Sequence, residues 1–198
     1  MKKFLHVGCG PATKAQTIPC LAADDWQEVR YDIDPSANPH ILGTMLDMTA
    51  VKSGSFDAVY SSHNIEHVYP HQVIPVLREF HRVLKPNGFV VITCPDLKAV
   101  CKLVAEGNLT GAAYYYPGGA ISPHEVLYGL GPELARDNLY MAHHCGFTLA
   151  TLFQSLEAAG FSEWAGYEHN PLAMTAVAKK TISNGVGIMD FTKSILGI

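Results

Sequence analysis

Strand-length apolar runs alternate with stretches of helical periodicity along this chain, and that alternation limits its fold more than any other feature. Residues 89–93 (FVVIT) are apolar almost throughout, which is typical of a central parallel strand buried on both faces. The preceding residues 70–84 carry apolar side chains at helical spacing, and residues 85–88 (KPNG) predict the end of that helix. A helix that leads into such a strand indicates βαβ units, and therefore an α/β fold.

Other segments extend this pattern. Strands are expected at 4–7, 28–31 and 56–60, a weaker strand at 40–42, and a short helix at 13–23 with Thr13 as its N-cap.

The C-terminal part predicts a change of strand direction. An amphipathic helix over 149–159 precedes two strands at 163–169 and 172–179, which are separated by little more than Asn170-Pro171. Parallel neighbours need a crossover of roughly a dozen residues, so these two strands must pair antiparallel. We therefore expect a three-layer α/β/α fold whose mostly parallel sheet ends in an antiparallel hairpin.

Length and composition indicate one domain. The 198 residues are 48% apolar and 16% charged, which is enough to build a core. We expect a single domain over 1–180 with an insertion at about 98–147, rich in Gly, Pro and Tyr, that acts as a lid. Residues 181–198 are expected to form a loosely held C-terminal tail.

Charge and cysteine content exclude several classes of protein. The net charge of −4 argues against a surface for nucleic-acid phosphates. No apolar run approaches the roughly 18–20 residues of a membrane span, and no secretory signal is apparent, so we expect a cytoplasmic protein without a membrane partner. Five cysteines without a CxxC pair predict reduced thiols and no metal site.

A glycine turn and a carboxylate indicate a ligand site. Gly8-Cys9-Gly10 joins the first strand to a helix, where glycines allow close approach of a ligand; a plain tight turn would explain the pattern equally well. The dinucleotide fingerprint requires glycine at its sixth position, but Thr13 stands there. Asp32 follows the next strand about twenty residues later, where a carboxylate can accept hydrogen bonds from both ribose hydroxyls.

The order of six segments gives a stronger indication. They are 5–11 (LHVGCGP), 31–34 (YDID), 43–48 (GTMLDM), 55–68 (SFDAVYSSHNIEHV), 79–88 (EFHRVLKPNG) and 152–161 (LFQSLEAAGF). Together they resemble class I S-adenosylmethionine-dependent methyltransferases, and most of all the small members with "LEH" after the fourth strand, which here reads Ile65-Glu66-His67. The resemblance implies a Rossmann-like seven-stranded sheet and S-adenosyl-L-methionine as the cofactor.

The resemblance also implies a set of cofactor-binding residues, all near the carboxyl ends of the first four strands: Gly8, Cys9, Gly10, Asp32, Ile33, Asp47, Met48, Ser61, Ser62 and His63. Residues 8–10 would run along the methionine half of the cofactor, and Asp32 would hold its ribose. Asp47 would take the adenine amino group, and the backbone of Met48 would meet a ring nitrogen. Residues 61–63 would line the sulfonium side.

Three departures from the family pattern keep other functions open. His6 replaces a usual acidic residue, Ala12 replaces a frequent glycine, and the helix that usually precedes the first strand is not apparent. The alternatives are a non-catalytic S-adenosylmethionine-binding sensor or subunit and, as a third choice, an NAD-dependent oxidoreductase.

The leading hypothesis is an enzyme that methylates a small molecule or a sugar-like metabolite. Histidine suits removal of a proton from the acceptor near neutral pH, and His63 and His144 are the candidate catalytic residues. Without a preceding helix, closure of the site would fall to segment 98–147 or to the second subunit of a homodimer.

Overall fold

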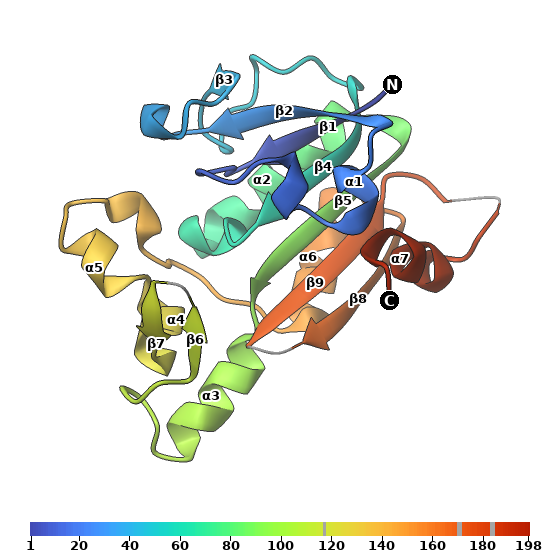
Figure 1. The fold of residues 1–198 in the computed structure, drawn as a ribbon. Coiled ribbons are helices and arrows are strands. Elements are labelled where there is room, and N and C mark those ends of the chain that lie inside the picture. Colours follow the sequence, from blue (N-terminus) through green and yellow to red (C-terminus); the bar gives the residue numbers. More distant parts are fainter. Residues whose placement is uncertain (117, 170–171, 183–184) are drawn as a thin grey trace.

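The computed structural model describes residues 1–116, 118–169, 172–182 and 185–198, and its centre is one seven-stranded sheet (Figure 1). The strand order is β3-β2-β1-β4-β5-β9-β8. The bounds are β1 Lys2–Val7, β2 Trp26–Asp32, β3 Ile41–Leu42, β4 Phe56–Ser62, β5 Leu84–Pro95, β8 Glu163–His169 and β9 Ala173–Lys179. Strands β1 to β5 are parallel, whereas β9 runs antiparallel to both β5 and β8. The predicted sheet and its antiparallel end are confirmed; the expected turn at 170–171 lies outside the described residues.

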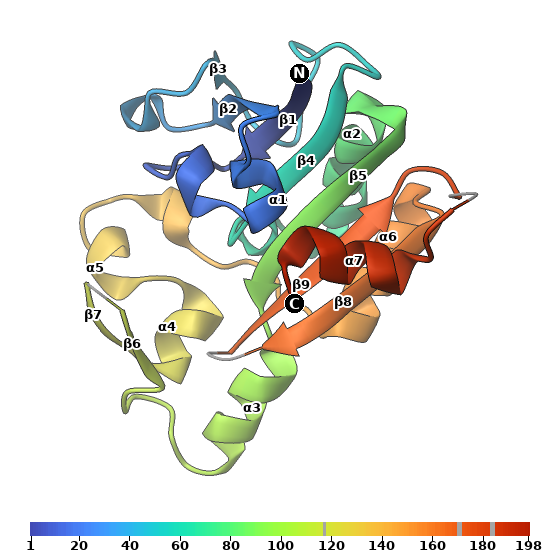
Figure 2. The same ribbon diagram turned by 45° about the vertical axis from the view of Figure 1, so that its right-hand side comes forward.

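Helices cover both faces of the sheet, as a three-layer fold requires (Figures 1 and 2). Helices α2 (Val73–Val83) and α6 (Leu149–Ala159) pack on one face, where the larger apolar core lies. Helices α1 (Pro19–Ala22) and α7 (Ile188–Leu196) cover the other face. The expectation of a loose C-terminal tail is wrong for 188–196, because the apolar positions of this segment recur at helical spacing and bury Ile195 against the sheet.

Two local predictions need correction. The helix expected at 13–23 is broken into a 3-10 turn, Lys14–Gln16, and α1, because Pro19 drives the preceding Ile18 into an extended conformation. Helix α2 ends just before residues 85–88, as predicted, but β5 already starts at Leu84. Residues 85–88 form a bulge in β5 that interrupts its pairing with β4.

Residues between β5 and α6 form a separate lobe beside the carboxyl ends of the parallel strands (Figure 1). It contains α3 (Leu97–Ala105), a hairpin of β6 (Tyr114–Tyr116) and β7 (Gly119–Ile121), α4 (Pro123–Tyr128) and α5 (Gly131–Leu134). Val100, Ile121 and Val126 form a small core of its own. This lobe corresponds to the predicted insertion at 98–147.

All five cysteines have free thiols in the structure. Among the helices of the described ranges, none combines the length and apolarity needed to cross a bilayer.

Candidate active site

The glycine turn lies where the strand order reverses, because β1 has β2 on one side and β4 on the other. Open α/β sheets bind ligands at this switch point, beyond the carboxyl ends of the strands. Gly8 and Gly10 have φ angles of +66° and +48°, which L side chains rarely adopt. The Asn64 side chain, from the loop after β4, occupies the space that a Cβ atom on Gly8 would need. Glycine at position 8 is therefore required both by its conformation and by this contact.

One face of β2 holds the glycine turn in place. Glu28, Arg30 and Asp32 alternate along the strand and so point to the same side. A Glu28 carboxylate oxygen accepts the Lys14 N–H at 3.0 Å, and the Arg30 guanidinium donates to the Gly10 carbonyl. Glu28 and Arg30 were not predicted to support the turn, although they alternate with Asp32 on one face of the strand.

Asp32 is itself part of this scaffold. Its carboxylate accepts the N–H groups of Gly10 at 2.7 Å and Asp34 at 2.9 Å, and the residue is buried at the end of β2. A carboxylate has about four lone-pair directions, so capacity for further donors remains. Ile33 follows it with its apolar side chain exposed.

The structure gives His6 a role that its departure from the family pattern did not suggest. The His6 Nδ1 atom lies 2.6 Å from the carboxylate of Glu28, which also holds the Lys14 backbone. Burial lowers the pKa of His6 although Glu28 opposes this shift. The acidic group usually present on β1 thus stands on the adjacent strand. Within the turn, burial raises the pKa of the Cys9 thiol to about 11, so this thiol stays protonated at neutral pH.

The loop that carries Asp47 is fixed by helix α2. Asp47 is exposed, but the Met48 N–H donates to a Glu79 carboxylate oxygen at 3.0 Å and the Met48 carbonyl accepts from Arg82 at 2.7 Å. The Met48 side chain is fully buried in the core. Helix α2 thus already uses both polar groups of the Met48 backbone, and the contact of this backbone with an adenine ring nitrogen stays a prediction.

We expect the substitution Glu79→Gln to lower the free energy of unfolding by roughly 2 kcal/mol at pH 7, because it removes charge-assisted hydrogen bonds to Arg82 and Met48. The hydrogen bond from Arg82 lowers the pKa of Glu79 from 4.5 in the folded state. Such a group stabilises the fold above its unfolded pKa, and the effect is lost as pH falls through the lower folded value. Urea unfolding should show the penalty at pH 7 and little of it at about pH 3.

Glu157→Gln, an exposed change on α6, is the matched control and should alter stability little at either pH. A Glu79→Gln penalty that is the same at both pH values would contradict the proposed ion pair.

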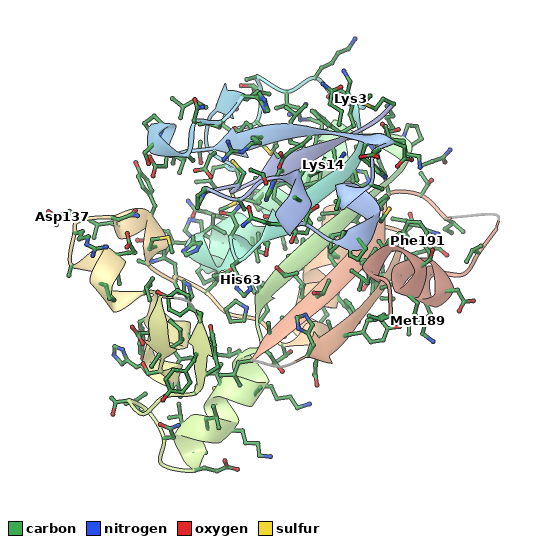
Figure 3. All side chains as sticks on the ribbon, viewed as in Figure 1. Lys3, Lys14, His63, Asp137, Met189 and Phe191 are labelled. Carbon is green, nitrogen blue, oxygen red and sulfur yellow. The ribbon has the colours of Figure 1, made fainter. Side chains whose placement is uncertain are left out.

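The end of β4 contributes three predicted residues with different surroundings. Ser61 is fully buried and accepts from Asn64 at 3.2 Å, while the Ser62 hydroxyl shares a 2.6 Å hydrogen bond with Thr93. His63 has a φ angle of +48°, and its side chain is 54% exposed (Figure 3). Only His63 of these three therefore presents a largely open side chain, and Ser61 acts by holding Asn64 against Gly8.

A cluster of ionisable groups lies behind His63. The His63 Nδ1 atom is 3.6 Å from a carboxylate oxygen of Glu66, a side chain that is 1% exposed. Burial would raise the pKa of Glu66 and lower that of His63, but their mutual attraction prevails, and the pKa shifts are downward for Glu66 and upward for His63. His67 and His143 also lie close to Glu66, and burial lowers the pKa of His143.

The predicted His144 lies next to this cluster and not within it. The His144 ring stacks on Tyr69 with centroids 4.3 Å apart, and the backbone N–H of His144 donates to the Glu66 backbone carbonyl at 2.8 Å. The fold brings Glu66 and His143 together from segments nearly eighty residues apart, and no sequence spacing indicated their contact.

Comparisons with known proteins find similarity to methyltransferases in both sequence and fold. Residues 5–92 match the family model of a methyltransferase domain. Solved S-adenosylmethionine-dependent methyltransferases share the fold: one from Archaeoglobus fulgidus (14% identity, 90% of this chain and 86% of that chain covered, TM-score 0.61), one from Methanosarcina mazei (17%, 91% and 93%, 0.59) and one from Mesorhizobium loti (16%, 89% and 90%, 0.58). A search of curated sequences finds no match.

The matched domain spans the strands that build the glycine turn, Asp32 and the end of β4, so the site and the family assignment concern the same residues. These findings favour methyl transfer over the NAD-dependent and non-catalytic alternatives, with S-adenosylmethionine as the cofactor. Residues 5–92 form a methyltransferase domain, and the chain has the fold of solved S-adenosylmethionine-dependent methyltransferases.

Proposed function

We propose that this methyltransferase acts on a small-molecule acceptor, of sugar-like size and polarity, bound between the end of β4 and the insertion at 98–147. The observation that carries the proposal is the position of His63. It is a half-exposed histidine in a left-handed conformation, at the strand end beside the glycine turn. Non-glycine residues in this conformation persist where the surrounding fold enforces them, and they cluster at functional sites.

The proposed cofactor pose follows the scaffold described above. The turn at 8–10 runs along the methionine half, Asp32 accepts the ribose hydroxyls in addition to its two backbone donors, and Ile33 and Asp47 meet the adenine. Ser62 and His63 then face the sulfonium. The Met48 backbone meets an adenine ring nitrogen in this pose once it exchanges its hydrogen bond to Glu79.

Methyl transfer from a sulfonium is an in-line displacement with an activated leaving group, so the protein chiefly aligns the acceptor and excludes water. For an oxygen or nitrogen acceptor, a proton must also leave. His63 is the first candidate to take it, and His144 is the second, because its exposed ring stacks on Tyr69 and its backbone N–H donates to the carbonyl of Glu66, the partner of His63.

The direct test is a screen of hydroxylated and amino metabolites with labelled cofactor, followed by His63→Gln on the acceptor that is found. Turnover should fall on the order of 100-fold while cofactor affinity changes little. His124→Gln, in helix α4 of the insertion, is the control and should retain activity. Turnover that is unchanged in His63→Gln would remove His63 from the acceptor site.

The insertion should close on the acceptor. We expect S-adenosylhomocysteine together with the acceptor to slow hydrogen exchange in 108–116 and 118–147, since a dry site favours the displacement. The exchange at 8–10 serves as the internal reference for cofactor binding. Protection at 8–10 without any in the insertion would place the closing element elsewhere, with a second subunit as the next candidate.

A further inference from the structure

Glu66 is the most unusual side chain outside the proposed cofactor contacts. It is 1% exposed, and neither of its carboxylate oxygens has a hydrogen-bond partner within the described residues. A buried carboxylate without donors is costly unless a cation compensates it. His63 lies near one oxygen at 3.6 Å, longer than a hydrogen bond, and its own ring is half exposed. The compensation that His63 provides is therefore incomplete.

Two further imidazoles lie close to the Glu66 carboxylate. Glu66, His67 and His143 each offer one ligand atom, and these atoms lie within 4.8 Å of one another. The ligand atoms of a tetrahedral zinc ion are about 3.4 Å apart, so small side-chain rotations suffice to close the set.

The tautomers of both rings are fixed by the backbone. The Nδ1 atom of His67 lies 3.0 Å from the Ala142 carbonyl, and that of His143 lies 2.8 Å from the Val126 carbonyl. A carbonyl only accepts, so each Nδ1 carries the proton and each Nε2 keeps its lone pair in the neutral ring. Metal-binding histidines show this second-shell arrangement, which orients the ring and raises its basicity.

A cavity of about 210 Å³ adjoins the cluster. Its lining includes Glu66, His143, Tyr128 and Cys145, so it lies between the loop after β4 and the end of the insertion. A cation held by three protein ligands keeps an open coordination position, and here that position can face the cavity.

We propose that Glu66, His67 and His143 form a binding site for a divalent transition-metal cation of the zinc type. The site ties the end of the insertion to the loop after β4 and leaves one coordination position for a ligand oxygen in the cavity. This inference does not depend on the identity of the acceptor. The sequence predicted no metal site, because its histidine and carboxylate ligands come from two segments far apart in the chain.

The test uses the full chain stripped with a chelator and titrated with Zn²⁺ in competition with a chromophoric chelator. We expect one tightly bound ion per chain, and a rise in the melting temperature when it binds. Glu66→Gln, His67→Gln and His143→Gln should each weaken binding by at least about 100-fold, since outer-shell changes alone cost about 10- to 100-fold. Co²⁺ should give the visible absorption of a four- or five-coordinate site.

His124→Gln and His144→Gln are the matched controls, because both histidines lie in the same lobe outside the cluster. Circular dichroism confirms that each variant is folded, and three independent ligand variants keep the test decisive if one of them is not. Absence of tight Zn²⁺ binding to the wild-type chain would overturn the site. So would equal affinity in the wild type and in the folded ligand variants.

Discussion

Gly8→Ala should weaken cofactor binding on the order of 100-fold or more. The added Cβ would overlap the Asn64 side chain, and the φ angle of +66° is itself unfavourable for alanine. The turn would have to shift away from the position in which its backbone lies against β2 and β4. Isothermal titration with S-adenosylhomocysteine measures the effect.

Gly54→Ala is the matched control. Gly54 has nearly the same φ angle, +63°, but apart from its chain neighbours no atom of the described residues lies within 4 Å of the added Cβ. It lies at the opposite end of β4. It should lose some stability and bind cofactor normally. Gly8→Ala combined with Asn64→Ala should recover part of the affinity, because the overlap is gone. If the double variant binds no better than Gly8→Ala, the contact with Asn64 is not the cause.

Asp32→Ala should weaken cofactor binding by roughly 30- to 150-fold, equivalent to about 2–3 kcal/mol. The variant loses the acceptor proposed for the ribose hydroxyls and also the 2.7 Å hydrogen bond that holds the Gly10 N–H. Titration with S-adenosylhomocysteine should rank the affinities as wild type, then Asp32→Asn, then Asp32→Ala, since asparagine keeps one acceptor oxygen.

Asp34→Ala provides the comparison two residues away. Among the residues that the structure describes, its carboxylate accepts only from the N–H and hydroxyl of Ser36, at the start of a 3-10 turn, and it is exposed at the surface. Its loss should cost a little stability and almost no affinity. Equal effects at positions 32 and 34 would mean that the ribose ligand is misassigned.

The main features of the fold follow from the sequence because they depend on local periodicity. The buried strand at 89–93, the helix that precedes it and the hairpin after Gly160 all follow from patterns within a few residues. The misjudged elements are governed by other interactions. Pro19 breaks a helix whose composition is otherwise suitable. Helix α7 packs on the sheet through Ile195, a tertiary contact that local periodicity does not specify.

The site was predictable where residues follow strands, and less so where partners come from elsewhere in the chain. Gly8, Gly10 and Asp32 stand at the ends of adjacent strands, and the structure brings them together as their order predicted. The hydrogen bonds that hold the Met48 backbone were not predicted, because their partners on α2 lie more than thirty residues away. The grouping of Glu66 with His143 depends on how the insertion folds back, which no local pattern specifies.

The most direct measurement is calorimetric titration of the wild-type chain with S-adenosylmethionine, S-adenosylhomocysteine and NAD under the same conditions. We expect both sulfur-containing ligands to bind with one site per chain and NAD to give no heat of binding, since Thr13 stands where a dinucleotide turn needs glycine. Binding of NAD, with no binding of S-adenosylhomocysteine, would contradict the assignment of the glycine turn and Asp32 to S-adenosylmethionine.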